Sequence, residues 1–451
     1  MIPKFGKHFS YLEITRLSPN PKTLNNKILA TNLKRGTLLA HPFSNTFKMK
    51  KKNKLAIIGT VGLPACYGGF ETLAEHLVEH TAKDYDITVY CSGKKYPKEE
   101  RQATYKGAKL KFLPFDANGV QSIIYDTLSI LHALFTADVM LVLGVAGAWI
   151  FPFIRLFTNK KIIVSIDGIE WKRDKWNKFA KWYLWWAEGI AVNYSHIDIS
   201  DNESIQNYTA QRYGSLSQII EYGADHTMKV KPTVSDKKQY PFLQKTYAFK
   251  VCRIEPENNV HVILESFATM QKYTLVIVGN WNINEYGRKL KTDYADYENI
   301  ILLDPIYNQR QLDVLRSNAM VYVHGHSAGG TNPSLVEAKY LGLPVIAFGV
   351  SYNRTTTGHR ALYFGNQEEL ITIIENTSVR DLAKLGKVMK SIADRRYTWE
   401  IIASKYNYLV QRALKSKNKE NVKSKIAQIP NTSLLQNKVG HLNNQKLFFE
   451  N

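Results

Sequence analysis

Short apolar runs alternate with longer amphipathic segments through the first half of the chain. The runs are rich in Val, Ile and Leu, as in strands of parallel sheets that are covered on both faces. The segments between them place apolar residues at helical spacing. Expected strands lie at 55–59, 86–92, 110–115, 140–144 and 161–167, and expected helices at 71–82 and 122–135. This alternation predicts a doubly wound α/β domain.

The alternation restarts after residues 228–244, a charged, Pro-containing stretch that we interpret as a linker. Expected strands then lie at 247–254, 274–279, 299–304, 320–325 and 344–348, and expected helices at 260–270, 309–319, from 333 onward and at 398–417. The pattern predicts two Rossmann-like domains, 49–227 and 245–397, that face each other across a cleft, followed by a C-terminal helix at 398–417. In such sheets ligands bind at the carboxyl ends of the strands.

The net charge of +21 is concentrated near the two ends of the chain. Residues 1–53 hold 11 Lys or Arg and one acid, and residues 415–451 hold 7 Lys and two acids. We therefore expect no nucleic-acid partner. We interpret 1–48 as a basic arm that is disordered or untranslated, with Met49 as the expected start, and 418–451 as a disordered polar tail.

The three cysteines are scattered and lack a CxxC spacing, which argues against a disulfide framework or a zinc site and suits a reducing cytoplasm. The longest uncharged stretch, 139–154, is too short to span a bilayer and contains glycine and proline. We expect a buried strand followed by a helix there, and no transmembrane segment. The N-terminus also lacks the apolar core of a signal peptide.

Four loops carry candidate chemistry, and the first is 59-GTVGLPACYGGFETLAEH-76. Gly68 and Gly69 allow positive φ and close approach of the backbone to a ligand at the start of a helix. The loop is not the GxGxxG dinucleotide fingerprint, because its glycines are spaced differently. A plain flexible connection is the alternative.

The second loop, 164-VSIDGIEWKRDKWNKFAKWYLWW-186, places Asp167 at the end of a strand, where polar chemistry is expected. Aromatic residues follow at helical spacing: Trp176, Phe179, Tyr183 and Trp186. Basic residues fall largely on the other side: Arg173, Lys178 and Lys181. A basic, Trp-rich helix could rest on an anionic membrane surface, and packing in the core is the alternative.

The third and fourth loops suit phosphate and sugar. Arg253, in 250-KVCRIEPENN-259, has a planar fork that matches a diphosphate, although a local ion pair with the nearby glutamates is the alternative. In 325-GHSAGGTNPSLVEA-338, an Asn-Pro pair predicts a helix start. Gly329, Gly330 and Thr331 before it could turn N–H groups towards an anion. Glu337, one turn inside the helix, could accept hydrogen bonds from sugar hydroxyls. Together they suggest a nucleotide-sugar.

Four motifs in this order, YGGFET, IDGIEWKRDKW, CRIEPENN and HGHSAGGTNPSLVEA, resemble those of family-4-type retaining glycosyltransferases with the GT-B fold. The resemblance covers roughly residues 54–414. The chain resembles in particular a bacterial subgroup that includes rhamnosyltransferases of capsule and polysaccharide assembly.

The resemblance implies roles for individual residues. Gly68 and Gly69 would approach the donor phosphates, Arg253 would bind the diphosphate, and Glu337 would bind the ribose. The loop that contacts the base would contain Ile306 and Tyr307.

Three positions depart from the family pattern. Asn258 stands where a lysine is usual, and Gly329 stands where the family has the first Glu of its E-x7-E motif. Asp167 stands where many members have a histidine beside the reacting sugar. The loss of one positive and one negative charge favours a deoxy sugar as donor, with the Gly-Gly-Thr amides as replacement donors of hydrogen bonds.

The resemblance therefore implies a cytoplasmic, metal-independent, retaining hexosyltransferase without a cofactor. Its donor would be a nucleotide-diphosphate sugar, with L-rhamnose as one candidate. Its acceptor would be a saccharide, expected to be lipid-linked, at an anionic inner-membrane face. The alternatives are a non-catalytic nucleotide-sugar-binding protein, and an epimerase or dehydrogenase, for which the expected GxGxxG is missing.

Overall fold

The structure is a computed structural model that describes residues 52–66, 68–166, 168–173, 176–270 and 273–417, together with 420, 422, 424 and 425. The predicted arm, 1–48, lies outside these residues, as do Asp167 and most of the predicted tail, 418–451.

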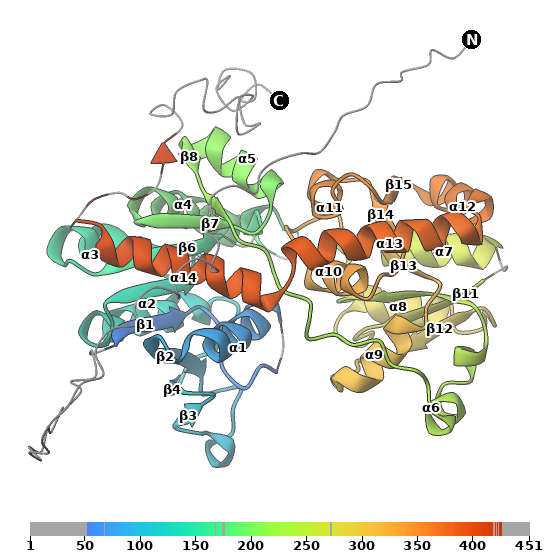
Figure 1. Cartoon of the computed structure of the whole chain (residues 1–451), viewed down its shortest axis with the longest axis horizontal. Helices are drawn as coiled ribbons and strands as arrows, with labels where there is room; N and C mark the ends of the chain where they lie inside the picture. The colour runs from blue at the N-terminus through green and yellow to red at the C-terminus, as the bar shows by residue number, and fades with distance from the viewer. Residues whose placement is uncertain are drawn as a thin grey trace, which may run out of the picture. The chain divides into compact units, whose positions relative to one another are not determined.

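Within the described residues, the first sheet has eight strands in the order β3-β4-β2-β1-β5-β6-β7-β9 (Figure 1). Neighbouring strands are parallel except for the antiparallel pair β3 and β4. The strands are β1 (Asn53–Ile58), β2 (Tyr85–Ser92), β3 (Thr104–Tyr105), β4 (Ala108–Leu113), β5 (Val139–Leu143), β6 (Lys161–Ile166), β7 (Ile197–Ser200) and β9 (Gln218–Ile219). A short antiparallel pair, β8 (Ser215–Leu216) and β16 (Ser424–Lys425), lies outside it.

Helices cover both faces of this sheet because successive strand residues point to opposite sides. Leu55 and Ile57 belong to one hydrophobic cluster, whereas Ala56 and Ile58 belong to another. The covering helices are α1 (Gly69–Thr81), α2 (Gln121–Thr136), α3 (Phe151–Phe157), α4 (Lys178–Tyr194) and α5 (Glu203–Tyr213). The second cluster contains buried residues of α2, α3, α4 and α5, so these four helices share one face of the sheet.

The second sheet has, among the described residues, six parallel strands in the order β12-β11-β10-β13-β14-β15. They are β10 (Tyr247–Val251), β11 (Thr274–Val278), β12 (Ile300–Leu303), β13 (Val321–His324), β14 (Val345–Phe348) and β15 (Leu362–Phe364). Its helices are α7 (Val260–Met270), α8 (Glu285–Asp293), α9 (Gln309–Ser317), α10 (Pro333–Tyr340), α11 (Ser351–Thr356), α12 (Gln367–Asn376) and α13 (Val379–Arg396). We call the parts built on the two sheets the first and second lobes.

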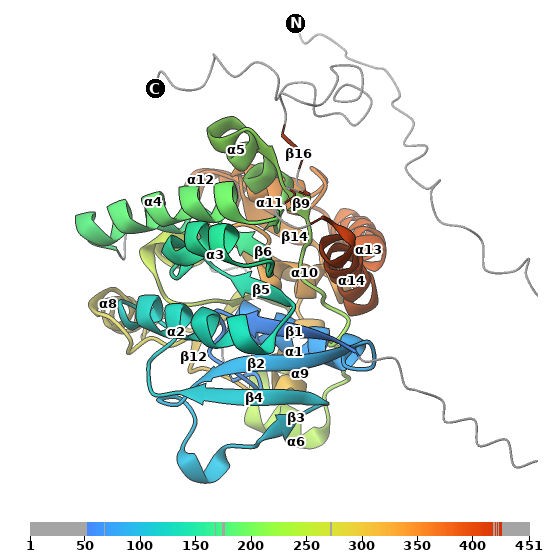
Figure 2. The ribbon, with the colours of Figure 1, turned by 90° about the vertical axis from the view of Figure 1, so that its left-hand side faces the viewer.

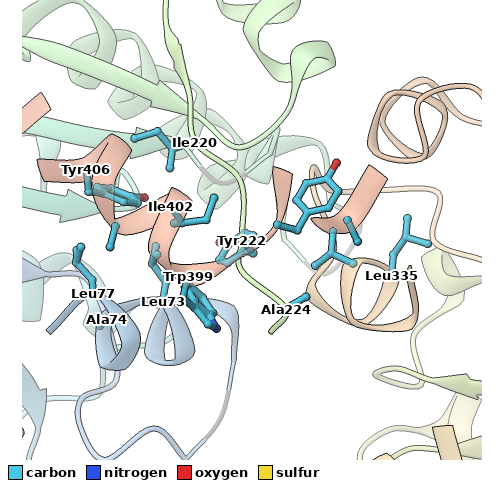
Figure 3. Close-up of a cluster of buried hydrophobic side chains, with 14 of the residues drawn as sticks. Leu73, Ala74, Leu77, Ile220, Tyr222, Ala224, Leu335, Trp399, Ile402 and Tyr406 are labelled. Atoms are coloured by element: carbon cyan, nitrogen blue, oxygen red, sulfur yellow. The ribbon is translucent and has the colours of Figure 1, made fainter. Parts of the chain in front are cut away.

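The C-terminal helix α14 (Trp399–Lys415) joins the two lobes. It follows α13 of the second lobe and packs on α1 of the first. Figure 3 shows Trp399, Ile402 and Tyr406 of α14 beside Leu73 and Leu77 of α1, in one buried cluster. The segment around Tyr222 runs through the same cluster towards α10. The same apolar cluster therefore continues from one sheet to the other.

Most predicted elements are present within a few residues of their expected bounds. The stretch predicted as a linker, 228–244, contains a short helix, α6 (Val234–Gln239), and a 3-10 turn at Pro241–Gln244. Thr233 and Asp236 form a reciprocal capping box at the start of α6, and this local hydrogen bonding compensates for the weak apolar pattern. As predicted for residues 139–154, a buried strand is followed by a helix, α3.

Candidate active site

The glycine loops of the two lobes lie against each other. A Cβ atom built on Gly69, at the start of α1, would lie 3.3 Å from Cγ of Pro333, at the start of α10. A Cβ atom on Gly168, after β6, would lie 3.2 Å from the carbonyl carbon of Gly329, after β13. Three of the four loops selected from the sequence therefore meet at the carboxyl ends of their strands, where ligands bind in doubly wound sheets.

Glu71 holds the first glycine loop in shape. Its Oε1 accepts hydrogen bonds from the amide of Val61 at 2.7 Å and from the hydroxyl of Thr60 at 3.3 Å. Gly68 has φ of 104°, and a Cβ there would lie 2.4 Å from Oε2 of Glu71. Burial raises the pKa of Glu71, although these hydrogen bonds and the charge of Arg253 oppose the shift. The Glu71 carboxylate therefore occupies the space where a side chain at position 68 would lie, which suits glycine there.

Arg253 extends from the loop after β10 and is exposed. The carbonyl oxygen of Arg253 accepts a hydrogen bond of 2.7 Å from Nδ2 of Asn258, which is buried. Where the resemblance leads one to expect a phosphate-binding lysine, this chain therefore has a side chain that fixes the backbone carrying the arginine. Burying the side-chain amide of Asn258 without this hydrogen bond would cost free energy of folding.

The glutamates near Arg253 have a different partner from the one the sequence suggested. Arg173, from the first lobe, places Nη2 2.6 Å from Glu257 and 3.2 Å from Glu255. The same guanidinium also contacts Glu170 at 3.2 Å. This cluster links the loop after β6 to the loop after β10.

The start of α10 has the predicted cap. The side chain of Asn332 accepts from the amide of Ser334 at 3.0 Å, and Pro333 is the first helical residue. The amide of Thr331, however, donates to the carboxylate of Asp201 at 2.8 Å, so an anion of the protein itself occupies it. A Cβ on Gly330 would lie 2.1 Å from the same carboxylate.

Unlike Gly330 and Thr331, Gly329 does not lie against the carboxylate of Asp201. It has φ of 124°, and among the residues that the structure describes a Cβ there would meet no heavy atom within 4 Å. Space for a side chain therefore exists at the position of the missing family glutamate, but the backbone conformation favours glycine.

Glu337 is the centre of a polar network that is largely shielded from solvent. Its Oε2 lies 2.7 Å from Nη2 of Arg316, and its Oε1 lies 3.1 Å from Nε2 of His226. Nδ1 of His226 accepts from the indole N–H of Trp399 at 3.0 Å, so a neutral His226 carries its proton on Nε2 and donates it to Glu337. Burial raises the pKa of Glu337, but Arg316 and His226 outweigh this and hold that pKa below its ordinary value. Glu337 is thus ionised and also has a structural role.

The loops after β10 and β13 enclose a set of basic groups that the sequence analysis missed. Lys250, His324 and His326 are buried. Among the described residues, Nζ of Lys250 and Nδ1 of His326 have no hydrogen-bond partner, whereas the side chain of Asn353 faces His324. The two imidazole rings stack with centroids 4.3 Å apart, and a Cβ on Gly325 would lie 3.2 Å from Nζ of Lys250. We call these three residues the buried basic cluster.

The electrostatics of the buried basic cluster are unfavourable without a ligand. Burial lowers the pKa of Lys250, His324 and His326, because each would have to carry its charge in a poorly solvated position. The charges of Arg253 and Arg173 lower the pKa of His326 further. A negative charge close to these groups would oppose the shift in their pKa values. The signal in the sequence was a lysine inside one apolar strand and an HGH triplet that begins at the last residue of another.

Other predicted residues are placed as follows. Tyr307, after β12, is exposed, and Ile306 is half-buried against the core. Asp167 lies outside the described residues. Trp176 precedes α4 and donates to Glu170, so it does not share the helical stripe predicted for it. Phe179 is 73% exposed, so the alternative of core packing is wrong for this residue.

Neither a metal site nor a membrane-spanning helix is found among the residues that the structure describes. Among them, no group of three or more His, Cys, Asp or Glu side chains is placed to hold a metal ion. In the same residues, no helix combines the length and the apolar character needed to cross a bilayer.

Comparisons with known families divide the chain as its two sheets do. Residues 52–225 match a family described as "Domain of unknown function (DUF1972)". Residues 233–383 match the family "Glycosyl transferases group 1". The comparisons support a GT-B glycosyltransferase. No curated protein matches the sequence significantly.

Solved structures of GT-B glycosyltransferases are similar to this chain. Sucrose-phosphate synthase from Thermosynechococcus elongatus aligns with a TM-score of 0.65 and 15% identity, over 80% of this chain and 98% of that one. HepE from Anabaena in complex with UDP-glucose aligns with a TM-score of 0.59 and 14% identity, over 80% and 99%. The catalytic domain of starch synthase IV from Arabidopsis thaliana aligns with a TM-score of 0.60 and 11% identity, over 81% and 100%. The predicted GT-B fold is therefore confirmed.

Proposed function

We propose that this GT-B protein transfers a hexose from a nucleotide-diphosphate sugar to a saccharide acceptor, with retention of anomeric configuration. The observation that carries the proposal is the buried basic cluster, Lys250, His324 and His326, at the carboxyl ends of β10 and β13, with Arg253 two residues after β10. Unpartnered basic groups at the carboxyl ends of two strands favour an anion with several charges, such as a diphosphate. The neighbour solved with UDP-glucose supports this class of donor.

The chemistry requires stabilisation of the leaving group more than a strong nucleophile. The bond between the anomeric carbon and the phosphate oxygen breaks, the electron pair leaves with the diphosphate, and the acceptor oxygen forms the new bond on the same face. The proton of the acceptor hydroxyl passes to the departing phosphate oxygen. Arg253, the buried basic cluster and the amides of Gly68 and Gly69 would stabilise the charge that develops on the diphosphate.

The remaining roles follow the resemblance. Glu337 would accept hydrogen bonds from the ribose, and Ile306 and Tyr307 would contact the base. Asp167 would lie beside the reacting sugar, so that Asp167→Asn should retain donor binding but slow turnover. The open space at Gly329 would receive the donor sugar, and the absence of a carboxylate there favours a deoxy sugar such as L-rhamnose.

The proposed setting is cell-surface polysaccharide assembly. The acceptor would be a lipid-linked saccharide, reached from the cytoplasm by a protein that rests on the inner membrane face. The exposed aromatic residues of α4 support this setting.

The test is release of nucleoside diphosphate from a panel of nucleotide-sugars, including nucleotide-linked L-rhamnose and glucose, with and without saccharide acceptor. We expect acceptor-dependent release from one donor, and a fall of about 100-fold or more in Arg253→Ala, because a charge-assisted contact to the leaving group is lost. A control, Arg288→Ala on α8, should match the parent. Tight donor binding without release from any donor would instead favour a non-catalytic nucleotide-sugar-binding protein.

A further inference from the structure

Three helices of the first lobe carry apolar side chains on their outer sides. They are α2, α3 and α4, which follow one another on one face of the first sheet (Figure 2). Their inner sides share one buried cluster, so the outer sides belong to a single face of the lobe. We call the exposed apolar residues of these helices the three-helix face.

On α2 the exposed residues form a complete stripe at helical spacing. Ile124, Leu128, Leu131 and Phe135 follow one another at intervals of four, three and four, and Phe135 is 87% exposed. This amphipathic pattern normally marks a side that is covered. Here the buried side of α2 is a different one, which includes Tyr125 and Ile130.

The short helix α3 adds three large side chains. Phe153, Leu156 and Phe157 are exposed, and Phe157 is 76% accessible. The indole N–H of Trp149, just before α3, donates to the hydroxyl of Thr127 on α2 at 2.9 Å, which ties the two helices together.

On α4 the exposed residues are aromatic. The rings of Phe179, Trp182 and Trp186 follow each other along the helix with centroids 5.9 and 6.4 Å apart, and the two indoles are parallel within 7°. Trp185 is also exposed. Tyr183 donates its hydroxyl to the carbonyl of Ala146 at 2.5 Å, which anchors α4 to the segment that leads into α3.

The charges on the three helices have one sign at the surface. Their acidic residues are Asp126 and Glu188, and both are buried. The basic residues include Lys178, which is exposed, and Lys181 and Arg155, which are partly exposed. Apolar patches of this extent on a lone chain mark an interaction site. Trp and Phe with flanking lysines suit the boundary between headgroups and acyl chains of an anionic bilayer.

We propose that the three-helix face docks the protein on an anionic lipid surface, with the side chains of α2, α3 and α4 inserted at the level of the headgroups. The charge argues against self-association as the occupant, because a second copy would oppose lysines with lysines. The inference extends the membrane contact considered for the aromatic helix to a surface of three helices, and it does not depend on the proposed transfer reaction.

The experiment is flotation of the full chain with vesicles of phosphatidylcholine, alone or mixed with phosphatidylglycerol. We expect the parent to float with the anionic vesicles and to be released by high salt. The face variant Phe157→Gln/Trp182→Gln/Trp186→Gln should partition at least about tenfold less. The control Val234→Gln/Val379→Gln/Tyr408→Gln replaces exposed apolar residues outside the three-helix face and should behave like the parent.

A second measurement covers failure of the face variant to fold. The Trp fluorescence of the unmodified parent should be quenched by brominated lipids in anionic vesicles, since three exposed indoles lie on this face. The proposal is overturned if the parent neither floats nor is quenched, or if a folded face variant floats like the parent. It is also overturned if sedimentation shows a dimer of the parent that the face variant dissociates, without binding to vesicles. No donor or acceptor is present, so these failures leave the transfer reaction to be judged by nucleotide release.

Discussion

Replacing Glu337 by alanine should destabilise the second lobe in addition to weakening donor binding. Arg316 is 1% exposed, and its Nη2 donates to Glu337 at 2.7 Å. Within the described contacts, the other carboxylate at this guanidinium is Asp313, which lies 3.9 Å from Nη1. The Glu337→Ala variant therefore leaves a buried positive charge with one distant partner, and it removes the acceptor of His226.

The size of the effect follows from this geometry. Removing one partner of a buried ion pair costs about 3–5 kcal/mol, and Asp313 should keep the cost near the lower limit, at about 3 kcal/mol. The lost hydrogen bond from His226 adds about 1 kcal/mol. At about 2–4 °C per kcal/mol, the unfolding midpoint should fall by on the order of 10 °C.

The assay is thermal unfolding followed by circular dichroism, together with calorimetric titration of a nucleoside diphosphate. The double variant Arg316→Met/Glu337→Leu should recover most of the stability, because no unpaired charge remains. The exposed carboxylate of Glu375 on α12 provides a control, and Glu375→Ala should shift the midpoint little. The reasoning is refuted if Glu337→Ala unfolds at the temperature of the parent, or if the double variant is as unstable as the single one.

The pH dependence gives an independent check on the same carboxylate. Because the folded state holds the pKa of Glu337 below its ordinary value, its contribution is complete above the unfolded pKa of about 4.3 and is lost as the pH falls through the folded pKa. Acid unfolding of Glu337→Gln should therefore depend less steeply on pH in this range than that of the parent.

Three further predictions concern Gly68 in the first glycine loop, Asp201 against the start of α10 and His76 on α1. Gly68→Ala places a Cβ 2.4 Å from Glu71 at φ of 104°. We therefore expect the free energy of unfolding in urea to fall by about 1–3 kcal/mol and donor binding to weaken. An unchanged free energy of unfolding together with unchanged donor affinity would contradict the role of this loop. Asp201→Asn keeps a hydrogen-bond acceptor for Thr331 but removes a negative charge. Nucleotide affinity measured by calorimetry should therefore rise by about fivefold. A fall in affinity would show that nucleotide binding needs the carboxylate. Burial and the charge of His226 lower the pKa of His76 to about 4. The parent should therefore lose up to about 3 kcal/mol of stability as the pH falls from 6.5 to 4, and His76→Phe should abolish this loss. Equal pH profiles of stability for the parent and His76→Phe would show that His76 does not cause the loss.

Local patterns determined the architecture. The alternation of apolar runs and amphipathic segments predicted strands such as 140–144 and helices such as 122–135, and these elements are present as β5 and α2. The cap of α10 was predictable because Asn332 and Pro333 act on the backbone next to them. The motif loops were predictable as a group, because parallel strands bring their carboxyl ends to one edge of a sheet.

The partners of the site residues were decided by the tertiary structure. Asp201 and Thr331 are separated by 130 positions, and no local pattern indicates that one will occupy the amide of the other. The pairing of Glu337 with Arg316 and His226 likewise depends on how helices and loops pack. A lysine such as Lys250 in an apolar strand is identifiable in the sequence, but its lack of a partner is not.

For the aromatic stripe around α4, too, local sequence patterns predict one part and tertiary packing decides the other. The sequence by itself determined that the helix has an apolar side, because spacing sets which residues share a side. Whether another layer covers that side depends on how the neighbouring helices are arranged around the sheet. The structure leaves Phe179, Trp182 and Trp186 exposed beside the exposed residues of α2 and α3, because these helices bury other sides against the sheet. Periodicity determines the sides of an element, whereas packing determines which of them meets solvent.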